Sequence, residues 1–542
     1  MEKKKKYLIL GIIILLVLGG VTVAYLTWSS DKINIGLNSD CFTIDYTKGG
    51  DINNASVKLM NESDLIDSNN KFTIKEGIAL TYANIGIKSI CGIEGYGSLY
   101  LNITSLSDAF TTGNSVGALK YAILKNASTS TVSVTNLLNQ SFDIEKTGSI
   151  TSTGTKKILT KQLSNTEINK YIIVIYIDNN RAGNDVIGST FSGKISASAN
   201  QGKIDANYTL QKLHSLNSTI VLDTTKTPDF STVSGNSGVK ENISDSDDTS
   251  VPNQGDGTKG IYSSVDDFGT TYYFRGDVDN NYLSFAGQMW RIVRINGDGS
   301  IRIVTQDSVG TSAYNTSYND NAYVGYMYGA PGSSSYAETH KNTNNSTIKT
   351  YLDNWYNNNL SSYADYIEDA IYCNDRSISS VTNLSSLTFT NEGYATDNTL
   401  YMSTERNSIN HSPSLKCSNV NDRFTVSTSK GNGALTVPIG LLTTDEVAFA
   451  GAYVCDLMSR IYITNKSYYL YLSNTSWWTM TPSYFVNGYA NVADVRRDGG
   501  VDSDNVTNGN ASYIGGVRPV VSLKSDVELE GTGTSDNPFT VG

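Results

Sequence analysis

Residues 113–117 (GNSVG) have the glycine–serine–glycine spacing that surrounds a nucleophilic serine in many hydrolases. That chemistry needs an apolar strand before the serine and a helix after it, so that the hydroxyl is exposed at a sharp turn. Here the surrounding residues, TTGNSVGALKYAIL, are typical of a turn that enters a strand. We therefore interpret Ser115 as a structural residue.

Metal ligands are sparse in this chain. Its three histidines lie far apart, without a Cys, Asp or Glu at metal-ligand spacing: His214, His340 and His411. Residues 277–281 (DVDNN) resemble part of a calcium loop, but Tyr282 replaces the required glycine and Gln288 the required acid. The sequence therefore predicts no metal and no cofactor. A polar turn is the expected structure at 277–281, with another calcium geometry as the alternative.

Two adjacent tryptophans stand near a cluster of charges. In a strand, Trp477 and Trp478 must point to opposite faces. Trp478 shares a side with Met480 and is expected in the core, which makes Trp477 the candidate for an exposed aromatic platform. The alternative is that both tryptophans are buried.

The segment DVRRDGGVDSDN follows these tryptophans, and its charged residues are Arg496, Arg497, Asp498, Asp502 and Asp504. Asp-Gly is a turn signal, so a solvated hairpin is one interpretation. The functional interpretation is a ligand surface in which these five residues flank Trp477. Aromatic stacking together with planar polar groups is a common way to bind sugars. No arrangement of residues in the chain predicts catalysis.

These candidate residues belong to a chain whose first 28 residues predict export. Four lysines at positions 3–6 precede an uncharged apolar run over residues 7–26, about long enough to cross a bilayer as a helix. The basic flank should remain cytoplasmic, with everything after Trp28 outside. The segment is either a retained single-pass anchor, which we favour, or a signal peptide cleaved near Thr22 and Ala24. The membrane is thus a predicted partner, and the protein is at the cell membrane or secreted.

Export permits disulfides among the five cysteines. We expect Cys41 to pair with Cys91, and Cys373 with Cys417, each within its own region. Cys455 is then left over in an apolar context, AYVCDLM, which favours a buried structural thiol.

Composition limits the possible partners. The 542 residues have a formal charge of −11, which argues against nucleic acid because that partner needs a positive footprint. Tyr is abundant at 35 residues, and many Thr, Val and Ile accompany it, so a mostly β protein is expected.

The chain divides into five predicted segments: an N-terminal segment (1–28), a β-sandwich (31–216), a flexible linker (224–258), an α+β domain (259–527) and a C-terminal tail (528–542). Residues 171–177 are apolar on both faces, which predicts a central strand covered on both sides. The linker has almost no apolar residues to offset the entropy of ordering.

Several elements of the α+β domain follow from local patterns. QMWRIVRI and SIRIVTQ flank NGDG, which predicts a hairpin. Helical periodicity over residues 346–360 predicts a helix with Asn345 or Ser346 as N-cap. Residues 443–446 (TTDE) predict a capping box at the start of a second helix. WWTMTPSYF, ANVADVRRDGGVDSDN and GGVRPVVSLK are expected strands.

Two regions resemble known families. AYLTWSSDK together with YIIVIYIDNNRAGNDVIGSTFSGKISASANQ loosely resembles the camelysin-like and biofilm-matrix fibre proteins of Gram-positive bacteria, which implies a β-sandwich. KGIYSSVDDFGTTYYFRGDVDNNYLSFAGQMWRIVRINGDGSI, CNDRS, GLLTTDEVAFAGA, WWTMTP and GGVRPVVSLK resemble an uncharacterised surface-protein domain of Bacilli. That domain is similar to the C-type-lectin-like fold of formylglycine-generating enzymes. Those enzymes hold copper with two nearby C-terminal cysteines, and this chain has no cysteine after Cys455.

Together these observations favour a non-catalytic bacterial surface protein that mediates adhesion to, or recognition of, an extracellular glycan or protein. A structural matrix or fibre component is the alternative, and an extracellular enzyme is the third possibility.

Overall fold

The computed structural model describes residues 27–30, 42–55, 57–89, 94–126, 137–165, 167–201, 204–230, 239–241, 258–384, 386–454, 461–463, 466–506 and 515–541. Several sequence predictions lie outside these residues: the apolar run at 7–26, the Cys41–Cys91 pair, Cys455 and most of the linker at 224–258. No helix within the described ranges combines the length and the apolar character that crossing a bilayer requires.

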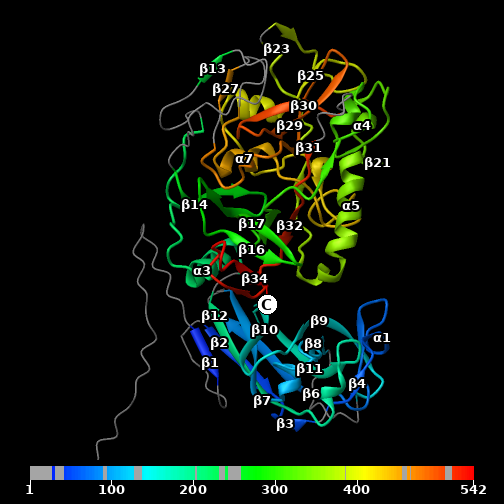
Figure 1. Ribbon diagram of the computed structural model, residues 1–542, viewed down its shortest axis with the longest axis vertical. Coiled ribbons are helices and arrows are strands. Elements are labelled where there is room, and N and C mark those ends of the chain that lie inside the picture. Colours follow the sequence, from blue (N-terminus) through cyan, green and yellow to red (C-terminus); the bar gives the residue numbers. More distant parts are fainter. Residues whose placement is uncertain are drawn as a thin grey trace, which may run out of the picture. The chain divides into compact units, whose positions relative to one another are not determined.

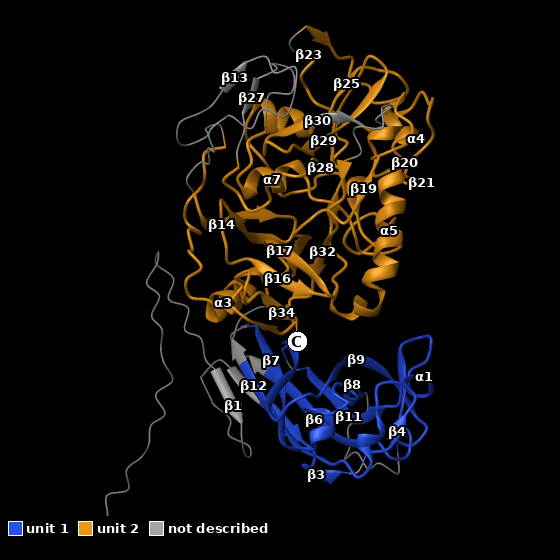
Figure 2. Ribbon diagram, viewed as in Figure 1, with its two compact units in different colours: residues 1–204 blue, residues 205–542 orange. Residues whose placement is uncertain are grey.

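The protein is mostly β, as predicted, and it divides into two compact units, residues 1–204 and 205–542 (Figures 1 and 2). The division lies before the expected boundary at residue 216. The reason is helix α3 (Ala206–Leu216), whose buried residues Leu210 and Leu213 join the core of the second unit. Thr209 of this helix also donates a hydrogen bond of 2.6 Å to the Gly299 carbonyl of that unit.

The described strands of the first unit form two sheets. One sheet has the order β1–β12–β7–β10, with β3 also paired to β12: β1 (Thr27–Ser30), β12 (Phe191–Gln201), β7 (Gly95–Leu106), β10 (Gly154–Leu163) and β3 (Ile52–Ala55). The other has the order β2–β6–β11–β8–β9–β5, with β4 paired to β11: β2 (Phe42–Lys48), β6 (Ala79–Ser89), β11 (Ile168–Asp178), β8 (Leu119–Lys125), β9 (Ser141–Ser149), β5 (Lys71–Thr73) and β4 (Leu59–Met60). The short helices are α1 (Glu62–Leu65), η1 (Asp108–Phe110) and η2 (Asn184–Val186).

The two sheets share one hydrophobic cluster, which contains residues of β6, β8 and β11 from one sheet and of β7 and β12 from the other. They approach closely at Gly97, where an added Cβ would lie 2.5 Å from Cδ1 of Ile85. The prediction of a central strand at residues 171–177 is confirmed. β11 pairs with β6 on one side and β8 on the other, and residues 171–177 are all buried.

The second unit is built on two larger sheets. The first contains β14 (Gly260–Asp266), β15 (Gly269–Arg275), β17 (Gln288–Ile295), β16 (Tyr282–Phe285), β34 (Phe539–Val541), β33 (Leu529–Glu530), β18 (Ile301–Thr305) and β32 (Val520–Leu523). The second contains β19 (Thr311–Ser312), β31 (Gly515–Gly516), β28 (Trp477–Val486), β29 (Tyr489–Val495), β30 (Val501–Asn505) and β25 (Thr399–Leu400). Short two-stranded pairs are β13 (Val239–Glu241) with β27 (Ile461–Ile463), β20 (Met327–Tyr328) with β21 (Asn344–Asn345), β22 (Tyr372–Cys373) with β26 (Arg423–Phe424), and β23 (Asn383–Leu384) with β24 (Leu387–Thr388).

Local predictions for this unit are confirmed. β17 and β18 form the hairpin around NGDG, and the side chains of Trp290, Ile292, Ile301 and Ile303 are fully buried. Helix α5 (Thr347–Asn359) begins after Ser346, whose hydroxyl accepts from the Lys349 N–H. Helix α7 (Thr444–Ala450) begins with the complete Thr443–Glu446 capping box. The remaining short helices are α4 (Tyr336–Thr339), α6 (Met402–Thr404), η3 (Asn321–Val324), η4 (Ser361–Tyr366), the π-helix η5 (Glu405–Ile409) and η6 (Val420–Asp422).

Residues 528–542 were expected to form a tail, and this expectation is corrected. β34 pairs in parallel with β16, with Phe539 opposite Leu283, and β33 pairs with β34. Phe539 is fully buried in the core of the unit. A single buried aromatic in a polar segment gave no periodicity from which to predict this strand.

Candidate functional site

The structure places Trp477 in the core, so the prediction of an exposed aromatic platform is wrong. Its side chain is 1% exposed, and the Arg518 guanidinium lies 4.8 Å from the centre of its ring. Trp478 is buried as predicted, and its Nε1 donates to the Ser312 carbonyl. The alternation of side chains along a strand predicted that the two rings point to opposite faces of β28. Both of these faces are buried within the unit.

In the charged hairpin that follows these residues, Arg496 is paired with carboxylates of the same hairpin. The hairpin joins β29 to β30, and Arg496 forms an ion pair of 2.6 Å with Asp502 and lies 3.9 Å from Asp498. Burial alone would lower the pKa of Arg496, but the attraction of Asp502 and Asp498 raises it. Arg497 is exposed, and the side chain of Asp504 lies outside the described residues. Without an exposed Trp477, this hairpin lacks the aromatic on which the predicted site depended.

Side chains of the two other candidate strings make hydrogen bonds within the protein. Ser115 is fully buried; its hydroxyl donates to Asp185 at 2.5 Å and accepts from the Gly183 N–H. In the calcium-like fragment, Asn281 is buried and its Oδ1 accepts from Arg291. Among the described residues no group of three His, Cys, Asp or Glu side chains could hold a metal ion.

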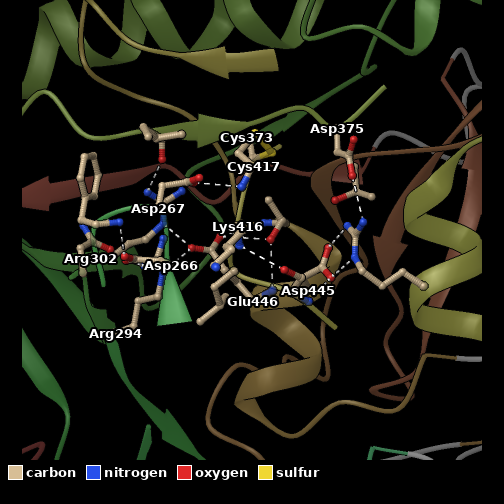
Figure 3. A pocket seen from close by; sticks show the side chains of 18 residues that line it. Asp266, Asp267, Arg294, Arg302, Cys373, Asp375, Lys416, Cys417, Asp445 and Glu446 are labelled. Carbon is tan, nitrogen blue, oxygen red and sulfur yellow. Dashed lines mark hydrogen bonds and ion pairs between the residues drawn. A yellow bond between two sulfur atoms is a disulfide. The ribbon is translucent and has the colours of Figure 1, made fainter. Parts of the chain in front are cut away.

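A cleft elsewhere in the second unit gathers charged side chains from segments that lie far apart in the sequence (Figure 3). Its volume is about 40 Å³. Its lining comes from the β14–β15 turn, β17 and β18, the end of β22, Arg406 of η5, residues 414–417, the start of α7 and Thr481 of β28.

The first wall is the tip of the β14–β15 hairpin. Asp266 pairs with Gly269, which leaves Asp267 and Phe268 as a two-residue loop. Gly269 has φ +126°, a conformation that a side chain would strain. The Asp266 carboxylate accepts from the Phe268 N–H, which fixes the loop. Phe268 is therefore held at the mouth of the cleft, where 38% of its surface is exposed.

The second wall contains the disulfide between Cys373 and Cys417, which confirms the predicted pair. The Cys417 N–H donates to Asp267 at 2.9 Å, and Arg423 bonds both to Asp267 and to the Cys417 carbonyl. The disulfide closes a loop of 44 residues and contributes about 2–4 kcal/mol to folding. The disulfide thus joins residues 414–417 to the end of β22, while the hydrogen bonds of Cys417 and Arg423 to Asp267 hold them at the tip of the first hairpin.

The floor is a buried network of two arginines and two carboxylates. Glu446, at the start of α7, contacts Arg302 at 2.6 Å and Arg294 at 3.0 Å, and Arg294 also pairs with Asp266 at 2.9 Å. Burial alone would raise the pKa of Glu446, but the two arginines lower it. The network is electrically balanced, and all four side chains are at least nine-tenths buried.

On the other side of the cleft, one arginine forms ion pairs with two carboxylates. Arg406, from the π-helix η5, makes two hydrogen bonds of 2.8 Å with Asp445 and one of 3.0 Å with Asp375. Burial alone would lower the pKa of Arg406, but Asp445 and Asp375 raise it. The Ser414 N–H donates to Asp445 as well. π-Helical turns often mark functional sites because they redirect side chains.

Comparison of the chain with protein-family models and with curated proteins finds no match. The interpretation of the cleft therefore depends on its own chemistry. Its carboxylates and guanidiniums are held rigidly, and both of its cysteines are consumed in the disulfide, so neither is a free thiolate. Such a surface is suited to hydrogen bonding with a polar ligand.

Sequence reasoning found parts of this cleft without recognising that they meet. The Cys373–Cys417 pair and the capping box at Glu446 were both predicted, but only as structural features. For Phe268, the only signal in the sequence was a turn-forming Asp-Asp-Phe-Gly string. Arg406 was an isolated basic residue with no pattern around it.

Proposed function

We propose that this chain is a non-catalytic binding protein of a bacterial cell surface, which recognises an extracellular glycan or protein through its second unit. In this proposal the N-terminal segment attaches the chain to the membrane, the first unit is a β-sandwich, and the second unit is a C-type-lectin-like module. The basic and apolar N-terminal pattern supports the location, and the paired sheets of the first unit support a sandwich.

One observation supports the binding role most directly: Phe268 is exposed at the mouth of a cleft whose walls are Arg–carboxylate pairs. An aromatic face supplies contact area, and planar charged pairs fix the orientation of hydroxyl or amide groups. This is the combination that the sequence suggested at Trp477, found at another place in the same unit.

The experiment is a glycan and protein binding screen of the intact chain, followed by two matched variants. Phe268→Ala should weaken binding of any ligand found by about 1 kcal/mol or more, because it removes the aromatic contact. Val265→Ala is the control, since Val265 is 52% exposed on the same hairpin and does not line the cleft. Equal binding by both variants would show that the ligand binds elsewhere.

A further inference from the structure

The size of the cleft limits what can enter it. A volume of about 40 Å³ compares with about 10–15 Å³ for one water measured in the same way. The enclosed part therefore accepts a group of about three or four non-hydrogen atoms. The rest of any ligand must remain at the mouth, beside Phe268.

The charges of the cleft are not evenly balanced. The Arg294–Arg302–Asp266–Glu446 network contains two positive and two negative groups, and Asp267 is matched by Arg423. By contrast, Asp375 and Asp445 share the single guanidinium of Arg406. Asp445 is only 4% exposed and Asp375 15%, so their shared excess of negative charge lies largely within the protein, where charges interact more strongly than in water. Lys416 is exposed at the rim, where solvent and salt screen its charge.

A second and independent observation comes from Asn296, which lines the same cleft and is 3% exposed. Its Nδ2 donates to Ser300 and Ser522, but its Oδ1 has no hydrogen-bond partner. A buried acceptor without a donor is costly, and a donor group of a ligand would relieve that cost. Asn296 and the Asp375–Asp445 pair thus both favour a ligand that donates hydrogen bonds.

From these contacts we infer that the cleft takes the protonated amine of a hydroxylated ligand, of the kind that an unacetylated amino sugar carries. The ammonium group lies against Asp375 and Asp445, a hydroxyl donates to Asn296, and the ring of the sugar contacts Phe268. This inference rests on the proposed binding function and specifies its ligand class.

The test is ligand-observed saturation-transfer NMR with the intact chain and three probes: glucosamine, N-acetylglucosamine and glucose. Glucosamine should bind about tenfold or more tightly than the two neutral sugars, because only it offers an ion-paired donor. Asp375→Asn keeps an oxygen to accept the Ser377 N–H but removes the charge, so it should abolish this preference. Lys416→Ala removes a positive charge that repels the ammonium group of glucosamine, so it should raise the affinity for glucosamine.

The outcomes separate the ligand class from the binding function. Equal binding of glucosamine and glucose, with both lost in Phe268→Ala, would overturn the amine assignment and leave the cleft as the site. The same holds if none of the three sugars binds while another ligand binds in a Phe268-dependent way. If Phe268→Ala changes no binding at all, the proposed function of the cleft fails together with the inference.

Discussion

The β14–β15 turn and the β29–β30 turn are both tight, aspartate-rich hairpin tips of the second unit, and they use their charges differently. Arg496 of β29–β30 is neutralised by Asp502 and Asp498 of its own hairpin. At the other tip, Asp266 pairs with Arg294 of β17, and Asp267 pairs with Arg423 of β26. Local pairing completes a hairpin by itself, whereas pairing across segments joins distant strands and builds a cleft.

The strongest test of this contrast is Glu446→Gln, which removes the charge that holds Arg294 and Arg302. We expect the second unit to lose about 3–5 kcal/mol, because two buried guanidiniums are left without their shared partner. Urea denaturation of the intact chain, followed by near-UV signals from its tryptophans, measures the change. A loss below about 1 kcal/mol would mean that the network is not needed for stability.

Removal of the disulfide should have the next largest effect. Cys373→Ser combined with Cys417→Ser should destabilise the second unit by about 2–4 kcal/mol, since the unfolded chain regains the freedom of a long loop. Thermal unfolding of this double variant against the oxidised parent is the measurement. Peptide mapping without reductant is the control for bond formation. Recovery of both cysteines as free thiols from native protein would refute the pairing.

Lowering the pH should destabilise the second unit in two stages. The first comes from His340, which does not line the cleft, and the second from Glu446 in the floor of the cleft. Burial, with a smaller effect of Arg376, lowers the pKa of His340 from 6.5 to about 3. The unfolded chain therefore binds a proton first, and stability falls as the pH drops from 6.5 toward 3, by up to about 1.4 kcal/mol per pH unit. Glu446, whose pKa is also lowered on folding, adds to the loss only below its ordinary value of 4.5.

The variant His340→Gln distinguishes these stages, because its amide can still donate to the Gly393 carbonyl that His340 contacts. Denaturation midpoints between pH 6.5 and pH 4.5 should then become nearly flat for the variant. Parallel pH profiles for the variant and its parent would assign the acid sensitivity to other groups.

The smallest expected effect is at the self-contained hairpin. Asp502→Asn removes one carboxylate partner of Arg496 but leaves Asp498 nearby. The cost should be about 1 kcal/mol, the net contribution of one hydrogen bond, because the Arg496 guanidinium keeps Asp498 as a carboxylate partner. Chemical denaturation beside Glu446→Gln gives the direct comparison. A loss as large as that of Glu446→Gln would remove the distinction between the two tips.

The features that the sequence predicted correctly are those decided by neighbouring residues. The β17–β18 hairpin, the Ser346 cap and the Thr443–Glu446 capping box depend on turn chemistry and short-range hydrogen bonds. The Trp477 assignment failed because alternation gives the two faces of a strand but not what covers each face. Its cover is Arg518, from a segment forty residues further on, whose guanidinium also donates to the carbonyl of Thr305.

The cleft was missed for the same physical reason. Its partners, such as Asp267 with Arg423 and Asp445 with Arg406, come together only when separate strands and loops have packed. No spacing rule relates such residues along the chain, and each of them alone is an ordinary polar residue of a turn or helix terminus. The binding character proposed for the cleft depends on these residues coming together in the folded unit.

The parallel pairing of β34 with β16 also governs the order in which the second unit can be made. During translation Leu283 leaves the ribosome long before Phe539, its neighbour in the sheet. Until then β16 has an open edge, which is a template for pairing with other chains. A nascent chain interrupted before residue 539 therefore retains an aggregation-prone edge, and the synthesis of β34 is the step that protects this sheet.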